Sequence, residues 1–140
     1  MANPIYPCLW FDNKAKEATD YYGSIFKNFK ITSQNEFVVM FELNNTKFMT
    51  LNSGPEFHFN EAVSFVVNCD TQEEIDYYWE KLCQGGEEGK CGWLKDKFGI
   101  SWQIVPSVLG KLMADKEKAP KVMYAFMQMK KFDIEKLINA

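Results

Sequence analysis

The sequence contains only one histidine, His58, among 140 residues. This excludes a zinc site built from several imidazoles and argues against a Ser-His-Asp triad. A lone histidine in a loop usually faces solvent, so we expect no catalytic role for His58. No run of eighteen apolar residues exists, and residues 1–10 lack a basic segment followed by an apolar core. The sequence therefore predicts neither a membrane span nor a signal peptide.

Positive charge and paired cysteines are also scarce. Lys and Arg number 16 against 19 Asp and Glu, a net charge of −3, which argues against a nucleic-acid partner. None of the four cysteines forms a C-x-x-C pair; they are Cys8, Cys69, Cys83 and Cys91. We therefore expect free thiols and a cytoplasmic protein.

Apolar residues are plentiful, at 46% of the chain, and this length predicts one domain with a real core. In the first half, residues 5–11 are a short apolar run typical of a strand, and Asp12 or Asn13 is placed to cap a helix that continues to Phe26. Residues 35–43 and 47–52 flank the turn residues Asn44-Asn45 and predict a hairpin.

The second half repeats this order. Residues 62–69 predict a strand, and Thr71 with Glu74 forms a capping box for a helix that ends at Gly85-Gly86. Residues 100–105 predict another strand, closed by Pro106, and helical patterns follow it.

An internal duplication explains the repeated order. The segment EATDYY, residues 17–22, matches EEIDYY, residues 73–78, at an offset of 56 positions. The same offset places the strand around Cys8 over the strand around Ser64, and a short gap places Thr50 over Gln103.

Four longer segments carry a family resemblance: CLWFDNKAKEA, GPEFHFNEAVSF, EEIDYYWEKL and GGEEGKCGWLKDKFGISWQIVP. With them, nearly the whole chain resembles the PhnB-like family, which is often labelled 3-demethylubiquinone-9 3-methyltransferase-like, within the vicinal oxygen chelate superfamily of glyoxalase I and bleomycin-resistance proteins. The resemblance implies an α+β fold with two βαβββ modules, about residues 4–53 and 61–106, in a single domain spanning 1–140. The modules would form a curved mixed sheet with helices outside and a helical tail, 107–140, and the protein would be a homodimer.

On this fold, strand alternation assigns the side chains to two faces. A large apolar set should pack on the helices: Leu9, Phe11, Phe65, Val67, Trp102 and Ile104. A mixed set should line a concave groove and supplies the candidate ligand-binding residues: Tyr6, Cys8, Trp10, Thr50, Asn52, Ser64, Asn68, Trp93, Ser101 and Gln103.

Metal-dependent relatives place His and Glu ligands at four inner positions. Carried over, these positions fall on Cys8 (or Tyr6), Thr50 (or Asn52), Ser64 and Gln103, none of which is His, Asp or Glu. Such groups are poor ligands for Ni, Zn, Fe or Mn, so we predict neither a metal nor another cofactor. A methyltransferase site needs a strand followed by a Gly-rich turn, and Gly85-Gly86 follow a helix instead.

The resulting prediction is a protein that binds a small organic ligand in the groove, with no nucleic acid or membrane as partner. Whether it catalyses a reaction stays open. The alternative is a metal-assisted enzyme of the glyoxalase or dioxygenase type, with a metal recruited through Cys8, Gln103 and Glu42. A weaker alternative is a regulatory partner protein without a pocket of ligand size.

Overall fold

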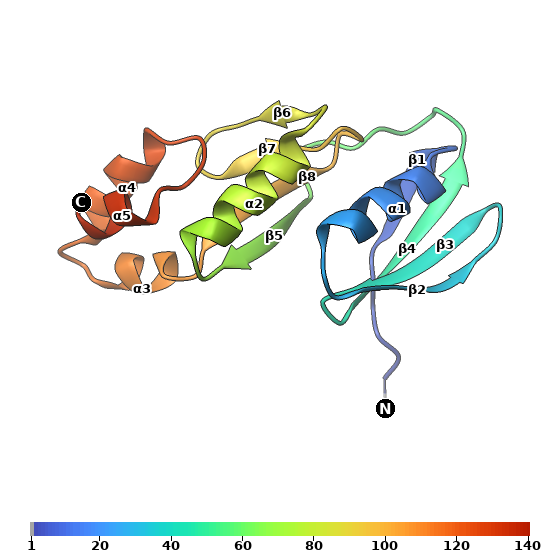
Figure 1. Cartoon of the computed structure of the whole chain (residues 1–140), viewed down its shortest axis with the longest axis horizontal. Helices are drawn as coiled ribbons and strands as arrows, with labels where there is room; N and C mark the ends of the chain where they lie inside the picture. Colours follow the sequence, from blue (N-terminus) through green and yellow to red (C-terminus); the bar gives the residue numbers. More distant parts are fainter. Residues whose placement is uncertain (1) are drawn as a thin grey trace. The chain divides into compact units, whose positions relative to one another are not determined.

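The computed structural model describes residues 2–140 and divides the chain into two compact units, Met1–His58 and Phe59–Ala140 (Figure 1). Each unit contains one four-stranded mixed sheet with a helix packed on one face. Strand, helix and three strands follow one another in both units, which confirms the α+β fold with two βαβββ modules. No helix within residues 2–140 is long and apolar enough to cross a membrane.

The first unit holds β1 (Cys8–Asp12), α1 (Ala15–Ile25), β2 (Phe29–Gln34), β3 (Val38–Leu43) and β4 (Thr46–Ser53). Its sheet order is β1-β4-β3-β2, with β1 and β4 parallel and the other neighbours antiparallel. The hairpin predicted from alternation is β3 and β4, whereas β2 carries too few apolar residues for the pattern to reveal it.

Helix α1 covers one face of this sheet. Its stripe of Ala15, Ala18, Tyr22 and Ile25 is buried, at 3% exposure or less, because these positions recur at helical spacing. Leu9 and Phe11 of β1 are buried on the same face, as alternation predicted.

The predicted cap of α1 is wrong. Neither Asp12 nor Asn13 caps the helix, since the N-cap residue is Lys14, whose side chain makes no capping bond. Asn13 instead takes a left-handed turn with φ of 57°. The side chain of Asn52, at the end of β4, accepts the hydrogen bond of the Ala15 N–H at 2.8 Å. A residue distant in sequence therefore satisfies the first turn of α1.

The second unit holds β5 (Ser64–Cys69), α2 (Gln72–Cys83), β6 (Glu87–Glu88), β7 (Trp93–Lys95) and β8 (Ser101–Pro106). The sheet order β5-β8-β7-β6 repeats that of the first unit, with β5 and β8 parallel. Ile75, Trp79 and Leu82 of α2 pack on the face that buries Leu94, Trp102 and Ile104, and Phe65 lies against Trp102 at 5.5 Å between ring centroids.

The capping box of α2 is confirmed. The Thr71 hydroxyl accepts the Glu74 N–H at 3.2 Å, and a Glu74 carboxylate oxygen accepts the Asp70 N–H at 3.1 Å. Unlike α1, this helix is capped by its own neighbours in sequence.

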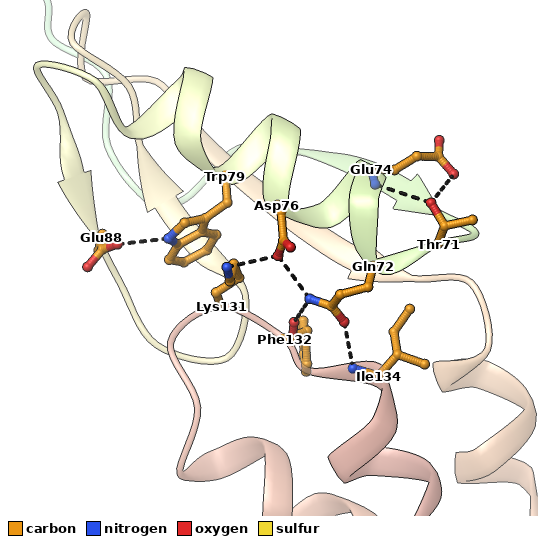
Figure 2. A network of polar contacts seen from close by, with 9 residues as sticks. All are labelled: Thr71, Gln72, Glu74, Asp76, Trp79, Glu88, Lys131, Phe132 and Ile134. Atoms are coloured by element: carbon orange, nitrogen blue, oxygen red, sulfur yellow. Dashed lines mark hydrogen bonds and ion pairs between the residues drawn. The ribbon is translucent and has the colours of Figure 1, made fainter.

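The tail consists of α3 (Leu109–Ala114), α4 (Ala119–Met127) and α5 (Ile134–Ile138). Figure 2 shows how the start of α2 holds it: the Gln72 side chain donates to the Phe132 carbonyl at 2.9 Å and accepts the Ile134 N–H at 2.9 Å. Lys131 adds an ion pair with Asp76 at 2.8 Å. This pair holds the pKa of Asp76 below its usual value.

Two backbone hydrogen bonds also anchor the tail. The N–H groups of Cys91 and Gly92 donate to the carbonyls of Met129 and Lys130, each at 2.8 Å. Gly92 has φ of 82°, and a Cβ there would lie 2.4 Å from the Phe132 ring. Only glycine fits this position, because it needs both the left-handed conformation and the close ring contact.

Candidate functional site

In each unit the sheet face turned away from the helix is the candidate binding surface, which we call the open face. In the second unit it carries Ser64, Asn68, Trp93, Ser101 and Gln103, all predicted inner-face residues. Direct strand partners share a face, and the register pairs Ser64 with Ser101 and Trp93 with Gln103. Val66 on the same face is 53% exposed, so this surface is accessible.

One polar pair stands out on this face. The Gln103 side-chain N–H donates to the Ser64 hydroxyl at 2.9 Å, joining β8 to β5. The side chains of Gln103 and Ser64 are half-buried, and Asn68 on the same strand as Ser64 is exposed. The Gln103 carbonyl oxygen keeps its capacity to accept a hydrogen bond from a ligand.

The open face of the first unit is different in chemistry. It presents Trp10 beside Met49 and Leu51, with Cys8 exposed at the start of β1. The Trp10 indole donates to the Gly54 carbonyl at 2.9 Å and meets the Phe57 ring edge-on at 4.9 Å between centroids. Tyr6 precedes β1 and receives the Lys47 ammonium 4.7 Å above its ring.

Two predicted site residues of the first unit, Thr50 and Asn52, belong to the helix-covered face instead. Thr50 is fully buried, lies opposite the buried Leu9 and donates to the Val39 carbonyl at 2.8 Å. Asn52 accepts from Ala15 and donates to the Glu36 carbonyl at 3.0 Å. The prediction aligned Thr50 with Gln103, whereas the strand registers make Leu51 the equivalent of Gln103. A shift of one residue moves a side chain to the opposite face.

No cysteine is set up as a nucleophile. Cys8, Cys69, Cys83 and Cys91 are free thiols, as predicted. Burial raises the pKa of Cys8 above its ordinary value. Burial, reinforced by neighbouring carboxylates, raises the pKa of Cys69 to about 12 and that of Cys83 to about 11. Cys8, Cys69 and Cys83 therefore stay protonated at neutral pH, and a neutral thiol is a weak nucleophile. His58 is exposed in the loop after β4.

The donor set does not fit a metal ion of the kind bound by metal-dependent relatives. On the open faces, Cys8 lies opposite Met49, and Ser64 lies opposite Ser101. Within residues 2–140, no three side chains of the His, Cys, Asp or Glu types come together as a possible metal site. We therefore derive no chemical step through a metal.

A small pocket on the second unit was missed by sequence reasoning. It has a volume of about 120 Å³ and is lined by parts of β6, β7 and β8 together with Glu61. Lys95 forms an ion pair with Glu61 there. The alternation of side chains along β7 indicates this pocket position, because it places Lys95 on the same face as Trp93.

A larger hollow of about 850 Å³ lies between the start of α2 and α5. Its walls include Gln72, Asp76 and Lys131, the residues that hold the tail (Figure 2). Because these polar groups are already engaged with one another, the hollow is part of the tail anchor.

Most residues of the block CGWLKDKFGISWQIVP form the strands β7 and β8 and the turn between them. Asp96 is buried and accepts the Phe98 and Ile100 N–H groups at 2.8 and 3.1 Å, and its second oxygen accepts the Trp102 indole at 2.9 Å. The turn between β7 and β8 is therefore built around one carboxylate. On the strands of this block, the side chains that face away from α2 are those of Trp93, Lys95, Ser101, Gln103 and Val105.

Comparisons with known proteins agree with this architecture. A family model described as 3-demethylubiquinone-9 3-methyltransferase matches residues 3–105. A PhnB protein from Bacillus cereus is 33% identical over 75% of this chain and 100% of its own, with a TM-score of 0.69.

More distant structures share the fold. The fosfomycin resistance protein FosX from Listeria monocytogenes, solved with Mn(II) and sulfate, is 12% identical over 83% of this chain and 98% of its own, with a TM-score of 0.61. A glyoxalase-related enzyme from Fulvimarina pelagi is 12% identical over 77% and 91%, with a TM-score of 0.56. The comparison with curated proteins gives no match. The chain belongs to the PhnB-like family, the one described as 3-demethylubiquinone-9 3-methyltransferase.

Proposed function

We propose that this protein binds a small organic ligand on the open faces of its sheets and needs no metal to do so. The observation that carries the proposal is the Gln103–Ser64 pair, which is held at 2.9 Å on a surface that remains accessible. A side-chain amide fixed by one hydrogen bond is oriented for a second one. Pockets for small molecules combine a few such polar groups with apolar walls.

The open face of the first unit offers a separate, apolar surface for a ligand. Trp10 is fixed by its bond to Gly54 and by the edge of Phe57, so its ring needs little further ordering on binding. An ordered aromatic side chain stabilises a flat ligand at a small entropic cost.

The donor set also favours binding over metal-assisted catalysis. FosX was solved with Mn(II), but at 12% identity it shares only the fold. Here Cys8, Ser64 and Gln103 supply a thiol with a raised pKa, a hydroxyl and a neutral amide, and within residues 2–140 no three side chains of the His, Cys, Asp or Glu types gather as a metal site. Hard or borderline divalent ions prefer carboxylates and imidazoles.

The methyltransferase name of the family is not carried over to this chain. Binding S-adenosylmethionine in the Rossmann manner needs a Gly-rich turn between a strand and a helix. The segments that follow β1 and β5 into their helices, residues 13–14 and 70–71, contain no glycine. We propose a homodimer, as the family resemblance implies, and a cytoplasmic location, which the free cysteines support.

The test has two arms on the same purified protein. A thermal-shift series with Ni, Zn, Mn and Fe, together with elemental analysis of protein purified without chelator, should show no stoichiometric, stabilising ion. Native mass spectrometry of protein from its own host should show a bound organic molecule that is lost in Gln103→Ala and kept in Gln84→Ala, an exposed glutamine after α2. A stoichiometric metal that raises Tm would overturn the proposal.

A further inference from the structure

The small pocket beside β7 contains a buried hydroxyl with no partner. Ser101 is 1% exposed, and its Oγ is the one buried side-chain nitrogen or oxygen within residues 2–140 that has no hydrogen bond. Ser101 lines the pocket of about 120 Å³. A buried polar group without a partner costs free energy, so such a group is a marker of a site that a ligand or water completes.

The strand registers place charges beside this hydroxyl. Glu87 lies opposite Lys95, and Lys95 lies opposite Ser101, so the three residues form one row across β6, β7 and β8 on the same face. Lys95 is already neutralised by its ion pair with Glu61. Glu61, through its ion pair, and Glu87, directly opposite on β6, both raise the pKa of Lys95.

The balance of charged side chains in the pocket then decides whether the ligand is a cation or an anion. Three carboxylates, Glu61, Glu87 and Glu88, and one ammonium, Lys95, line the pocket, so two negative charges are left over. An anionic ligand would meet this excess charge and be repelled. A cation would be attracted to Glu87 and could donate a hydrogen bond to Ser101.

The size and rigidity of the pocket narrow the ligand class. A volume of about 120 Å³ corresponds to roughly four water molecules at about 30 Å³ each, which suits an ammonium group on a short stem. The wall at Gly89 is fixed by the hydrogen bond from its N–H to the Trp93 carbonyl at 2.8 Å. The described acidic side chains do not converge on one point as a metal ion requires.

We propose that this pocket binds the ammonium group of a small organic amine, with Ser101 and Glu87 as its hydrogen-bond acceptors. The inference rests on the proposed function, because Ser101 and Gln103 share the open face of the second unit. Residues two apart on a strand are separated by roughly 6.5 Å. The ligand class is therefore an amine with a polar group about 6–7 Å from its nitrogen, placed to meet the Gln103–Ser64 pair.

The probe is n-butylammonium, compared with butan-1-ol and butyrate at neutral pH. The chain has four tryptophans, so the indole region of a ¹⁵N-correlated NMR spectrum contains four signals. Trp93 lines the pocket, and the Trp79 indole donates to Glu88, which also lines it, whereas the Trp102 indole donates to Asp96, which does not. Butylammonium should shift the Trp93 indole saturably and leave the Trp102 indole in place, whereas butyrate and butan-1-ol should shift neither.

Variants make the test specific. Ser101→Ala and Glu87→Gln should each raise the Kd for butylammonium about tenfold, since each removes one charge-assisted hydrogen bond. Ser101→Ala removes a hydroxyl without a partner and Glu87 is exposed, so both variants should fold. Glu73→Gln, an exposed glutamate on α2, is the matched control and should leave Kd unchanged.

The outcomes separate the two proposals. Equal shifts with butan-1-ol, or an unchanged Kd in Ser101→Ala and Glu87→Gln, would overturn the ammonium site. If the ligand found by mass spectrometry is not an amine but still depends on Gln103, the ammonium site is overturned and the proposed function stands. If butylammonium binds as described but no host ligand is found, the proposed function is overturned and the pocket remains as a cation site.

Discussion

The two units share one architecture and differ on their open faces. The helix-covered faces are alike: Leu9 and Phe11 in the first unit and Trp102 and Ile104 in the second are all buried. The open faces differ, with Trp10, Met49 and Leu51 in one unit against Ser64, Ser101 and Gln103 in the other. The duplicated scaffold is therefore maintained by packing under the helix, and the chemistry diverges where no packing constrains it.

The units also differ in what secures each helix. Helix α1 takes its cap from Asn52 on β4, 37 positions from Ala15, whereas α2 carries its own cap in Thr71. The first turn of α2 additionally holds the tail through Gln72 (Figure 2). The first unit thus depends on a distant strand, and the second depends on the tail that follows it.

The largest expected effect comes from the tail anchor. Gly92→Ala should lower the free energy of unfolding of the second unit by about 3 kcal/mol, because alanine meets the left-handed φ and the Phe132 ring at once. Hydrogen exchange resolved by residue should show faster exchange in β8 and in residues 129–137. Amides of β3 and β4 should keep the wild-type rates.

Gly110→Ala is the matched control. Gly110 lies in α3, and a Cβ there meets nothing within 4 Å. Alanine should therefore be neutral or stabilise by up to about 1 kcal/mol through helix propensity. If Gly92→Ala exchanges like Gly110→Ala, the second unit does not depend on its tail and the comparison fails.

An intermediate effect comes from exchanging the two kinds of cap. Asn52→Ala removes bonds to Ala15 and Glu36 and should destabilise the first unit by about 2 kcal/mol. Thr71→Ala removes one cap bond and should destabilise the second unit by about 1 kcal/mol. Urea denaturation gives both values, and hydrogen exchange assigns each loss to its unit.

Asn52→Asp refines the cap test, since it keeps the acceptor for Ala15 and loses the donor to Glu36. It should recover about half of the loss in Asn52→Ala. The contrary result is that Asn52→Ala and Thr71→Ala lower the free energy of unfolding equally, with Asn52→Asp no better than alanine. That result would show that the cap from the distant Asn52 stabilises its unit no more than the local cap from Thr71 does.

Local signals made most of the fold predictable. The capping box at Thr71, the helical stripes and the alternation of β1 and β8 are all written in adjacent residues, and the duplicated segment linked the two halves. The strands β2 and β6 were not apparent, because β2 is largely polar and β6 has two residues, so neither shows an apolar period.

The candidate site was predictable only where register did not matter. Trp10, Ser64 and Gln103 lie on strands whose own alternation fixed their faces. Thr50 and Asn52 were misplaced because the pairing of β4 with β1 decides their face, and sequence periodicity does not contain that pairing. The partnership of Lys95 with Glu61 also joins residues 34 positions apart, which no local pattern encodes.

The smallest expected effect is a difference between the two units in how their stability depends on pH. The pKa of Cys69, at the end of β5, is raised to about 12 by burial and by Glu74 and Asp70, while Cys8, at the start of the corresponding strand β1, is exposed. Above about pH 9 the unfolded thiol loses its proton and the folded one keeps it, so unfolding releases a proton and stability falls as pH rises.

Between about pH 8 and about pH 10 the loss of stability due to Cys69 should reach about 1 kcal/mol. Urea denaturation across this range should therefore give a flatter pH dependence in Cys69→Ala than in wild type, whereas Cys8→Ala, which removes a thiol whose pKa is raised less, should flatten the curve less. Parallel curves for wild type and Cys69→Ala would contradict this assignment, because they would place the alkaline loss on groups common to both proteins.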